Sequence, residues 1–322
     1  MDILTVGEVL VEFVKKNKDS PHYERGEYVG PFPSGAPAIF VDTGARLGMK
    51  TGIVGGIGND EFGKVIKDRL EKDNVDTRKL LVFDGITTGI AFVMYFSSGE
   101  RRFVFTLKQS AAAQVKPEHI EEDFVKETKV VHIMGSALSL NESMREACYK
   151  AVRIATQHGL IVTYDPNLRA ELIEPSLIMR ISEPILKVAE LVMPSKNELL
   201  DLTGKRNVEE AAEEVLKYGV KQVIVKLGNE GSYLITKDEK YFEPAYEVNE
   251  RDPTGAGDAF DAGYIMMYLK GKNYKESLKF ANAVGALKVT NFGPMEVPSS
   301  LEEVEEFMKS SKQRAKKASR VL

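Results

Sequence analysis

Two glycines and two carboxylates surround a short turn in residues 252–260, which read Asp-Pro-Thr-Gly-Ala-Gly-Asp-Ala-Phe. Apolar residues recur at helical spacing after Gly257, which places the N–H groups of Gly255, Ala256 and Gly257 at the positive end of a helix dipole. Such a turn binds anions, and glycine permits the close approach that a phosphate needs. Asp258 is placed to accept the proton of an attacking hydroxyl. We therefore expect residues 255–258 to be catalytic residues of a phosphoryl transfer.

The same turn has a second interpretation, in which it only starts a helix and Asp258 is a favourable acid of the first turn. The acids Asp252 and Asp258, which bracket the turn, favour the catalytic interpretation. The segment resembles the second signature of the ribokinase-like (PfkB) carbohydrate kinases, D-T-x-G-A-G-D, with Pro253 where Thr is more common. The resemblance implies that residues 255–257 form the anion hole for the transferring phosphate and that Asp258 is the catalytic base.

The composition is that of an ordinary soluble α/β protein of 322 residues, with 43% hydrophobic and 29% charged residues. A net charge of −4 argues against nucleic acid as a partner. The single cysteine, Cys148, excludes an internal disulfide and a cysteine zinc cluster. The chain starts with a strand-like segment and no export or membrane-spanning signal, so we expect no membrane partner and a cytoplasmic location. We interpret His132, inside the apolar run 130–134, as a strand-end residue rather than a metal ligand.

Apolar strands alternate with amphipathic helices after about residue 110, which is typical of a parallel sheet covered on both faces. The expected strands are 130–134, 160–164, 191–193, 222–226 and 231–236, and the expected helices are 142–157, 209–218 and 274–290. Before residue 110, four strand-like segments follow one another with few helices between them: 10–14, 23–29, 89–96 and 102–106. No repeat or linker divides the chain, so we expect one continuous domain over residues 1–322.

The family resemblance implies a more specific fold. It implies a ribokinase-like, doubly wound and mostly parallel sheet flanked by helices, with a small β-sheet lid over the sugar. The lid would be formed by residues of about 8–33 and 87–107. The resemblance also allows two copies of the chain to associate through this lid.

Three segments resemble the first signature of the family: Ser34–Ala38, Ala45–Gly48 and Gly58–Gly63. Gly35 would let the sugar lie close to the backbone. Ile39 stands where the family has an Asn that binds the sugar, and Glu12 stands where a sugar-binding Asp is usual. The glycine-rich stretch 52–58 fits this signature better than a dinucleotide site, because Glu61 occupies the place of the third glycine.

Further motifs concern ATP and Mg²⁺. Residues 193–204 resemble P-N-x-x-E…L-T-G, with Ser195 in place of the Asn and Glu198 in place of the Glu, which implies an ATP-binding role for Ser195 and a Mg²⁺ held by Glu198 through water. A capping box between these two residues fits the same spacing. Residues 226–231 resemble the K-x-G-x-x-G turn near the nucleotide, formed by Lys226, Gly228 and Gly231, although a plain β-turn would use the same glycines. Asn282 matches an Asn near the adenine ring, and it also suits tight helix packing.

The segment Asp165–Arg169 follows a strand directly, at the edge where open α/β sheets bind ligands. It resembles the D-x-N-x-R motif of the fructokinase and 2-keto-3-deoxygluconate kinase branches. We expect Arg169 to hold a phosphate or sugar oxygen through its planar donors.

The choice of sugar rests on the lid. Leu107 stands where relatives specific for sugar acids have an Arg, and residues 98–103 resemble the fructokinase hairpin. We therefore expect ATP-dependent phosphorylation of D-fructose at its 6-hydroxyl, with 2-keto-3-deoxygluconate as the alternative substrate. A catalytically silent sugar- or nucleotide-binding homologue is the alternative of another class. Asp252 and the turn Asn291–Gly293 are the expected border of a K⁺ site.

Overall fold

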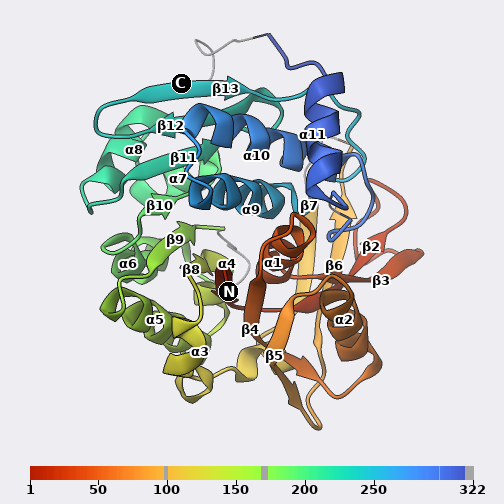
Figure 1. Cartoon of the computed structure of the whole chain (residues 1–322). Coiled ribbons are helices and arrows are strands. Elements are labelled where there is room, and N and C mark those ends of the chain that lie inside the picture. The colour runs from red at the N-terminus through yellow and green to blue at the C-terminus, as the bar shows by residue number, and fades with distance from the viewer. Residues whose placement is uncertain (98–100, 168–172, 297, 316–322) are drawn as a thin grey trace.

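A large twisted sheet of nine strands forms the centre of the protein, for which a computed structural model describes residues 1–97, 101–167, 173–296 and 298–315 (Figure 1). In spatial order the strands are β13 (Lys240–Pro244), β12 (Gly231–Ile235), β11 (Gln222–Lys226), β10 (Leu191–Val192), β9 (Ile161–Asp165), β8 (Val130–Met134), β1 (Ile3–Val6), β4 (Thr51–Gly58) and β5 (Asp76–Phe83). The strands from β11 to β5 are parallel, and at the other edge β12 pairs antiparallel with both of its neighbours, β11 and β13. Continuous apolar runs such as β8 are buried on both faces, as parallel sheets require.

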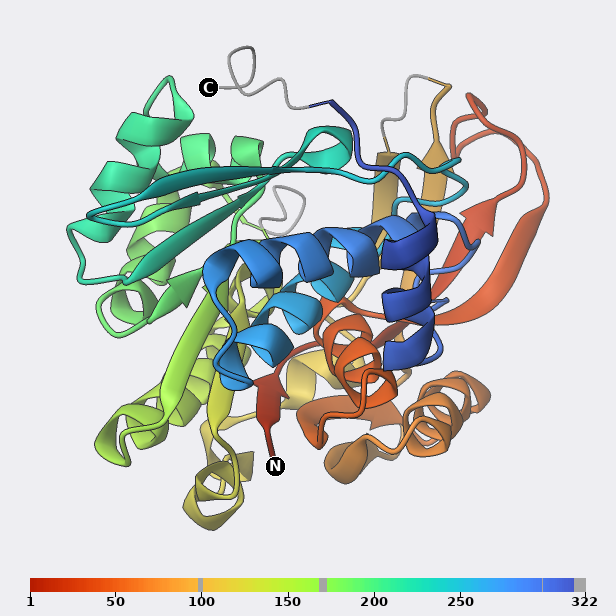
Figure 2. The ribbon, with the colours of Figure 1, turned by 45° about the horizontal axis from the view of Figure 1, so that its top comes forward.

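Helices cover both faces of this sheet, as the alternation of strands and helices predicts (Figures 1 and 2). One face carries α1 (Ala36–Arg46), α2 (Glu61–Lys72), α9 (Ala256–Leu269), α10 (Tyr274–Val289) and α11 (Leu301–Ser310). The other carries α3 (Glu122–Lys126), α4 (Gly135–Leu140), α5 (Glu142–Gln157), α6 (Pro175–Leu186), α7 (Lys196–Thr203) and α8 (Val208–Leu216). The doubly wound, mostly parallel fold is thereby confirmed.

A second, four-stranded sheet lies beside the large one, in the order β3 (Tyr28–Ser34), β2 (Leu10–Lys15), β6 (Gly89–Tyr95) and β7 (Arg101–Thr106) (Figure 1). β2 and β3, and likewise β6 and β7, are antiparallel, whereas β2 and β6 are parallel. The second expected strand, 23–29, is displaced, and residues 28–34 form the strand instead. Pro31 and Pro33 lie in it, and an edge strand such as β3 tolerates prolines.

The region before residue 110 holds more helix than its sequence pattern indicates. α1 and α2 lie there, and β1, β4 and β5 join the large sheet rather than the small one. Nine consecutive residues of α1, 36–44, are buried, so the helix has no exposed polar stripe to reveal its period. Later boundaries agree closely, since β8, β11 and α5 begin and end at the expected residues.

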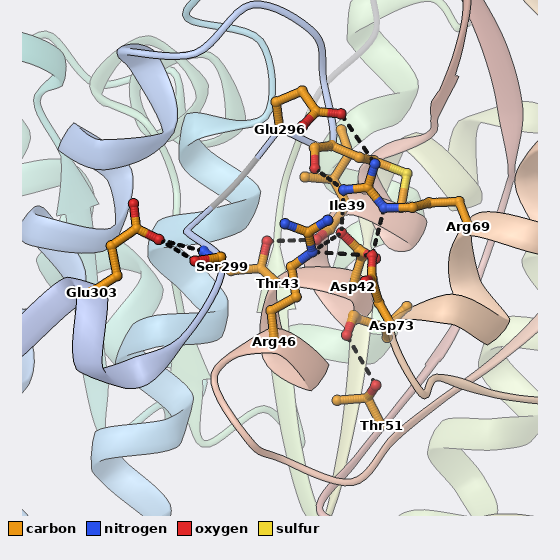
Figure 3. Close-up of polar contacts among 12 residues, drawn as sticks. Ile39, Asp42, Thr43, Arg46, Thr51, Arg69, Asp73, Glu296, Ser299 and Glu303 are labelled. Carbon is orange, nitrogen blue, oxygen red and sulfur yellow. Dashed lines mark hydrogen bonds and ion pairs between the residues drawn. The ribbon is translucent and has the colours of Figure 1, made fainter.

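A buried cluster of charges ties α1 and α2 to the segment that follows α10 (Figure 3). The Arg69 guanidinium lies 3.4 Å from Asp42 and 3.1 Å from Glu296. It also pairs with Asp73 and donates to the carbonyl of Met295. Because Asp42 is fully buried and Arg69 nearly so, these bonds fix the position of residues 295–296 relative to the two helices.

Two single residues noted in the sequence are part of the core. His132 is fully buried in the middle of β8, where its Nδ1 lies 2.8 Å from Thr163 Oγ1 and its ring stacks on Phe40. Burial lowers the pKa of His132 to about 3. Cys148 is a buried free thiol. Within the described ranges, none of the helices combines the length and the apolar character that crossing a bilayer would take.

Candidate active site

One pocket of about 540 Å³ brings together most of the residues that the sequence singles out. It is lined from both sheets and from the first turn of α9. The predicted residues on its wall are Glu12, Gly35, Ile39, Ser195, Glu198, Lys226, Gly228, Gly231, Gly255, Ala256, Gly257, Asp258 and Asn282. Arg169 and residues 98–100 of the hairpin lie outside the described residues. Asp252 is fully buried next to the pocket and is not part of its lining.

The turn ahead of α9 is shaped by Gly255. This residue is the N-cap and has a φ of +84°, in the left-handed region that favours glycine. A β-carbon there would lie 2.6 Å from the Pro294 carbonyl oxygen and 3.0 Å from Ile39 Cγ2. Gly255 has no side chain to cap the helix, so it accepts no side-chain hydrogen bond from the first-turn N–H groups of Gly257 and Asp258. The helix thus presents its positive end to the pocket.

Asp258 lies in this first turn, at 6% exposure, on the pocket wall. Asn167 Nδ2 donates to Asp258 Oδ1 at 3.1 Å. Asn167 itself follows β9 with a φ of +35°, and its N–H donates to Asp165 Oδ1 at 3.1 Å. The motif after β9 therefore meets the turn of α9 across 91 residues of sequence, and it orients the Asp258 carboxylate.

Glu12 is a buried carboxylate from β2 in the small sheet. It is 3% exposed, and its Oε2 accepts from Ser34 Oγ at 3.2 Å. Its Oε1 has no hydrogen-bond partner, and the same holds for Asn167 Oδ1. Burial, together with the nearby Asp252, raises the pKa of Glu12 to about 7. Two buried acceptors on one pocket wall are therefore available to hydroxyl groups of a ligand.

Ile39 and Gly35 frame this part of the pocket at the start of α1. Ile39 is 2% exposed and packs against Gly255, so an apolar contact replaces the sugar-binding amide that the resemblance implies. Gly35 has a φ of +107°, and a β-carbon there would lie 2.7 Å from the Glu8 carbonyl oxygen. The close approach of the Glu8 backbone and the positive φ therefore both require glycine at this position, which lines the pocket.

Lys226, at the end of β11, lies below the turn of α9. Its Nζ is 2.9 Å from Asp165 Oδ2 and 3.0 Å from Asp261 Oδ2, and a β-carbon on Gly257 would lie 3.5 Å from it. Burial acts against the charge of Lys226, but the two carboxylates prevail and raise its pKa. The ammonium is therefore held charged beside Gly257 by two acids.

Ser195 and Glu198 form the capping box that their spacing allows. Glu198 Oε2 accepts from the Ser195 N–H at 2.7 Å, and Ser195 Oγ accepts from the Glu198 N–H at 3.3 Å. Both residues also line the pocket, so the capping interpretation and the binding interpretation hold together. The described part of the chain contains no group of three or more His, Cys, Asp or Glu side chains suited to a metal ion. The Glu198 carboxylate on the pocket wall fits Mg²⁺ that keeps several waters and is bound mainly through phosphates, because such an ion needs few protein ligands.

The remaining predicted nucleotide residues, Gly228, Gly231 and Asn282, also line the pocket. Gly228 and Gly231 have φ values of +58° and +130°. A β-carbon on Gly231 would lie 2.1 Å from the Glu243 carbonyl oxygen, so packing against β13 already requires this glycine. Asn282 Nδ2 donates to the same carbonyl at 3.1 Å. Two of these residues thus have structural roles in addition to their place on the pocket wall.

Asp252 is held from several sides beneath the loop that leads to α9. Its Oδ1 accepts from Tyr95 Oη at 2.7 Å and from the Thr254 N–H at 2.9 Å, and its Oδ2 accepts from the Gly293 N–H at 2.9 Å. Burial alone would raise its pKa, but Lys288 and these bonds lower it. Asp252 is therefore an ionised buried acid that ties the loop to the turn at residue 293.

Comparison with known proteins identifies the family. The model of the pfkB family carbohydrate kinases matches residues 1–300. The chain belongs to the pfkB family of carbohydrate kinases. This confirms the resemblance carried by the two signatures.

Relatives within the pfkB family include "Fructokinase-2" of Oryza sativa subsp. japonica, 33% identical over 300 residues that cover 90% of this chain and 89% of that protein. The "5-dehydro-2-deoxygluconokinase" of Clostridium perfringens is 30% identical over 97% of this chain and 94% of that protein.

Solved structures agree with this family assignment. The crystal structure of "a putative Ribokinase II" from E. coli with ATP and Mg²⁺ has a TM-score of 0.89 and 39% identity, over 96% of this chain and 99% of that one. A Vibrio cholerae fructokinase double mutant with fructose, ADP and potassium has a TM-score of 0.85 and 27% identity, over 96% and 98%. The ribokinase-like fold is thereby confirmed.

The sequence motifs gave no individual role to three charged residues of this pfkB kinase. Arg101 of β7 lines the pocket and donates to Thr254 Oγ1 at 3.3 Å. Asp261 pairs with Lys226, and Lys288 contacts Asp252. The sequence feature that could have indicated Asp261 and Lys288 is a charged residue inside an apolar helical run, since few residues near them in α9 and α10 are polar. Arg101 carries no such signal.

Proposed function

We propose that this carbohydrate kinase uses ATP to phosphorylate a primary hydroxyl of a small sugar, and that D-fructose is the acceptor, giving fructose 6-phosphate. One observation carries the proposal: the Asp258 carboxylate, the positive end of α9 and two unpartnered buried acceptors share one pocket. The fructokinase relatives and the homologous structures with ATP or fructose support it.

The proton of the sugar hydroxyl passes to Asp258. The hydroxyl oxygen attacks the γ-phosphorus, a new O–P bond forms, and the bond to the β-phosphate oxygen breaks so that ADP leaves. The Asn167 amide donates to Asp258 Oδ1 and thereby fixes the carboxylate plane towards the acceptor. Proton transfer to a positioned general base such as Asp258 contributes about 10²–10⁴-fold to a rate.

The transferring phosphate is stabilised by the N–H groups of residues 255–257 and by the α9 dipole. The Lys226 ammonium lies just below Gly257 and adds positive charge to the same side of the pocket. Mg²⁺, when bound with ATP, supplies charge neutralisation between the phosphates, and Glu198 would hold it through water. Closure of the small sheet over the sugar would exclude water and suppress ATP hydrolysis.

The sugar is recognised at the end of the pocket that Glu12 and Asn167 line. Their unpartnered oxygens accept hydrogen bonds from hydroxyl groups of a polyol, and Ile39 supplies apolar contact. Leu107, 2% exposed on the same wall, offers no charge to a sugar acid. Arg101 is the observation that favours the alternative, 2-keto-3-deoxygluconate, because its guanidinium could pair with a carboxylate.

ADP formation tests the proposal. The chain is assayed with ATP, Mg²⁺ and a panel of fructose, 2-keto-3-deoxygluconate, ribose and nucleosides. We expect fructose to give the highest kcat/KM, while a preference for the keto-deoxy acid would select the alternative. A catalytically silent binding protein would form no ADP with any of them.

The Asp258→Asn variant tests the role of the base. We expect it to fold as the wild type does and to lose about 10²–10⁴-fold in kcat. Asp201→Asn, on the exposed face of α7, is the matched control and should leave kcat unchanged. Near-normal turnover of Asp258→Asn would leave this residue with the helix-start role alone.

Association of two copies through the small sheet is a further part of the proposal. Val29 and Val104 are 40% and 48% exposed on this sheet, which supports an apolar contact there. The molar mass of the protein in solution tests this association. If the protein is a dimer, Val104→Lys should convert it to the monomer.

A further inference from the structure

Lys288 is a fully buried lysine near the C-terminal end of α10. Its Nζ donates to the main-chain carbonyl of Asp252 at 3.0 Å, and it lies 3.9 Å from Asp252 Oδ2. Both side chains have no solvent exposure. Because a buried ammonium is stable only with oxygen partners, Asp252 and Lys288 form one unit.

This unit lies directly behind the anion-binding turn. The Asp252 N–H donates to the Val289 carbonyl at 3.2 Å, next to Lys288, and the Asp252 side chain holds the Thr254 N–H. Only Pro253 and Thr254 separate Asp252 from the N-cap Gly255. The position of the Lys288 charge is therefore coupled through a short, buried loop to the N–H groups that face the pocket.

The expected potassium site does not fit these residues. A monovalent cation beside Asp252 needs main-chain and carboxylate oxygens that are free to coordinate it. Here the Asp252 carbonyl and Oδ2 already face an ammonium, and Oδ2 also accepts from the Gly293 N–H of the turn that was expected to border the ion. K⁺ and an ammonium group carry the same charge and are of similar size, so the two exclude each other.

We propose that Lys288 supplies, from within the chain, the positive charge that a bound monovalent cation would otherwise supply beside Asp252, and that this kinase works without potassium. The charge offsets the buried Asp252 carboxylate and keeps residues 253–255 in the conformation that points the α9 amides at the phosphate. The inference rests on the proposed phosphoryl transfer for its catalytic meaning.

Other charged groups act on Lys288 from the surrounding elements. Burial is the largest influence and lowers the pKa of Lys288, although Asp252, Glu12 and Glu296 act to raise it, and Arg101 acts to lower it further. The geometry carries the assignment of the charge, because the Lys288 ammonium donates to the Asp252 carbonyl and faces the Asp252 carboxylate.

The first experiment compares ions on the wild type. ADP formation is measured in choline chloride, sodium chloride and potassium chloride at equal ionic strength, after the enzyme has been freed of K⁺ and NH₄⁺. We expect equal rates in all three salts. A rate at least about tenfold higher in potassium, equivalent to 1.4 kcal/mol, would overturn the inference.

The second experiment removes the charge. Lys288→Ala leaves space behind the loop, and we expect a loss of about 10²-fold in kcat, as for misplaced reacting groups. Potassium or ammonium chloride should restore its rate, and choline chloride should not. Lys288→Met fills the space with an uncharged chain, so no salt should restore it. Lys279→Ala, on the exposed side of α10, is the matched control and should behave as the wild type.

Thermal unfolding separates this inference from the choice of sugar. In the absence of substrates, potassium should raise the Tm of Lys288→Ala above that in choline chloride, and it should have no specific effect on the wild type. If no sugar yields ADP, the acceptor proposal fails while this ion comparison still decides the role of Lys288. A folded Lys288→Ala that works at the wild-type rate in choline chloride, or that no cation restores, would contradict the inference. If the variant does not fold, the wild-type comparison decides.

Discussion

Replacement of Glu12 by Gln should stabilise the protein and weaken sugar binding. Glu12 is 3% exposed, and burial together with Asp252 raises its pKa from 4.5 to about 7. The folded state therefore binds a proton more tightly than the unfolded state does. At about 1.4 kcal/mol for each pH unit between the two pKa values, the ionised Glu12 lowers the free energy of unfolding by about 3 kcal/mol above pH 7.

The sign of the pH dependence follows from this difference. The contribution of the protonated Glu12 is fully present below pH 4.5 and is lost as the pH rises through about 7. Since Gln does not titrate, the unfolding free energy of Glu12→Gln minus that of the wild type should increase by about 3 kcal/mol across this window. Urea unfolding at a series of pH values measures it. Glu146→Gln, on the exposed side of α5, is the control and should show no such increase.

The functional consequence runs in the opposite direction. The Glu12 carboxylate retains an unpartnered Oε1 on the pocket wall, where it can accept from a sugar hydroxyl. Glu12→Gln keeps one acceptor but loses the charge, so we expect KM for the sugar to rise by about 10-fold or more, as for a hydrogen bond to a charged group. A difference in stability that stays constant with pH would refute the reasoning about burial. An unchanged KM would refute the reasoning about binding.

Two further substitutions test the backbone around the site. Gly255→Ala should lower the free energy of unfolding by about 1–3 kcal/mol, because its β-carbon would lie 2.6 Å from the Pro294 carbonyl at a φ of +84°; Gly257→Ala, whose nearest contact is 3.5 Å away, is the control in the same urea titration. Asp60→Ala should cost about 1–2 kcal/mol at neutral pH, because Asp60 caps α2 and also accepts from the Thr88 N–H at 2.8 Å. Burial opposes the charge of Asp60, but these hydrogen bonds lower its pKa. The wild type should therefore lose the stability that Asp60 contributes only as the pH falls through this lowered pKa. An equal loss of stability in Asp60→Ala over the same pH range would contradict the assignment.

The parts of the fold that could be predicted are those whose burial has a simple period. β8 and β11 are continuous apolar runs, and α5 alternates polar and apolar faces, so their bounds follow from the sequence. α1 could not be recognised, since it is buried nearly all round and carries glycine and proline. β3 was displaced because its prolines are tolerated only at the edge of a sheet, and the position of a strand in its sheet depends on distant partners.

The site divides in a similar way. Residues 255–258 and the first turn of α7 act through local backbone geometry, which a short motif encodes. Arg101 and Lys288 act through contacts with residues more than 30 positions away, at Thr254 and Asp252. No spacing rule connects such pairs. Sequence alone therefore indicated the turn ahead of α9 together with Lys226 and Asp252, and gave no role to Arg101, Asp261 or Lys288.

These charges explain how an acid-rich pocket can receive a polyanion. Asp165, Asp252 and Asp261 are all buried around the start of α9. Burial raises the pKa of Asp261, whereas the charges of Asp165 and Asp252, if uncompensated, would oppose the attraction of the helix dipole for phosphate. Lys226 lies between Asp165 and Asp261, and Lys288 faces Asp252, so each group of acids has an ammonium within hydrogen-bond distance of one of its oxygens. The acids in turn hold the lysines in place without exposing them to solvent. In the proposed reaction, such pairing leaves the amides at the mouth of α9 to attract the phosphate, while Asp258, on the pocket wall, accepts the proton.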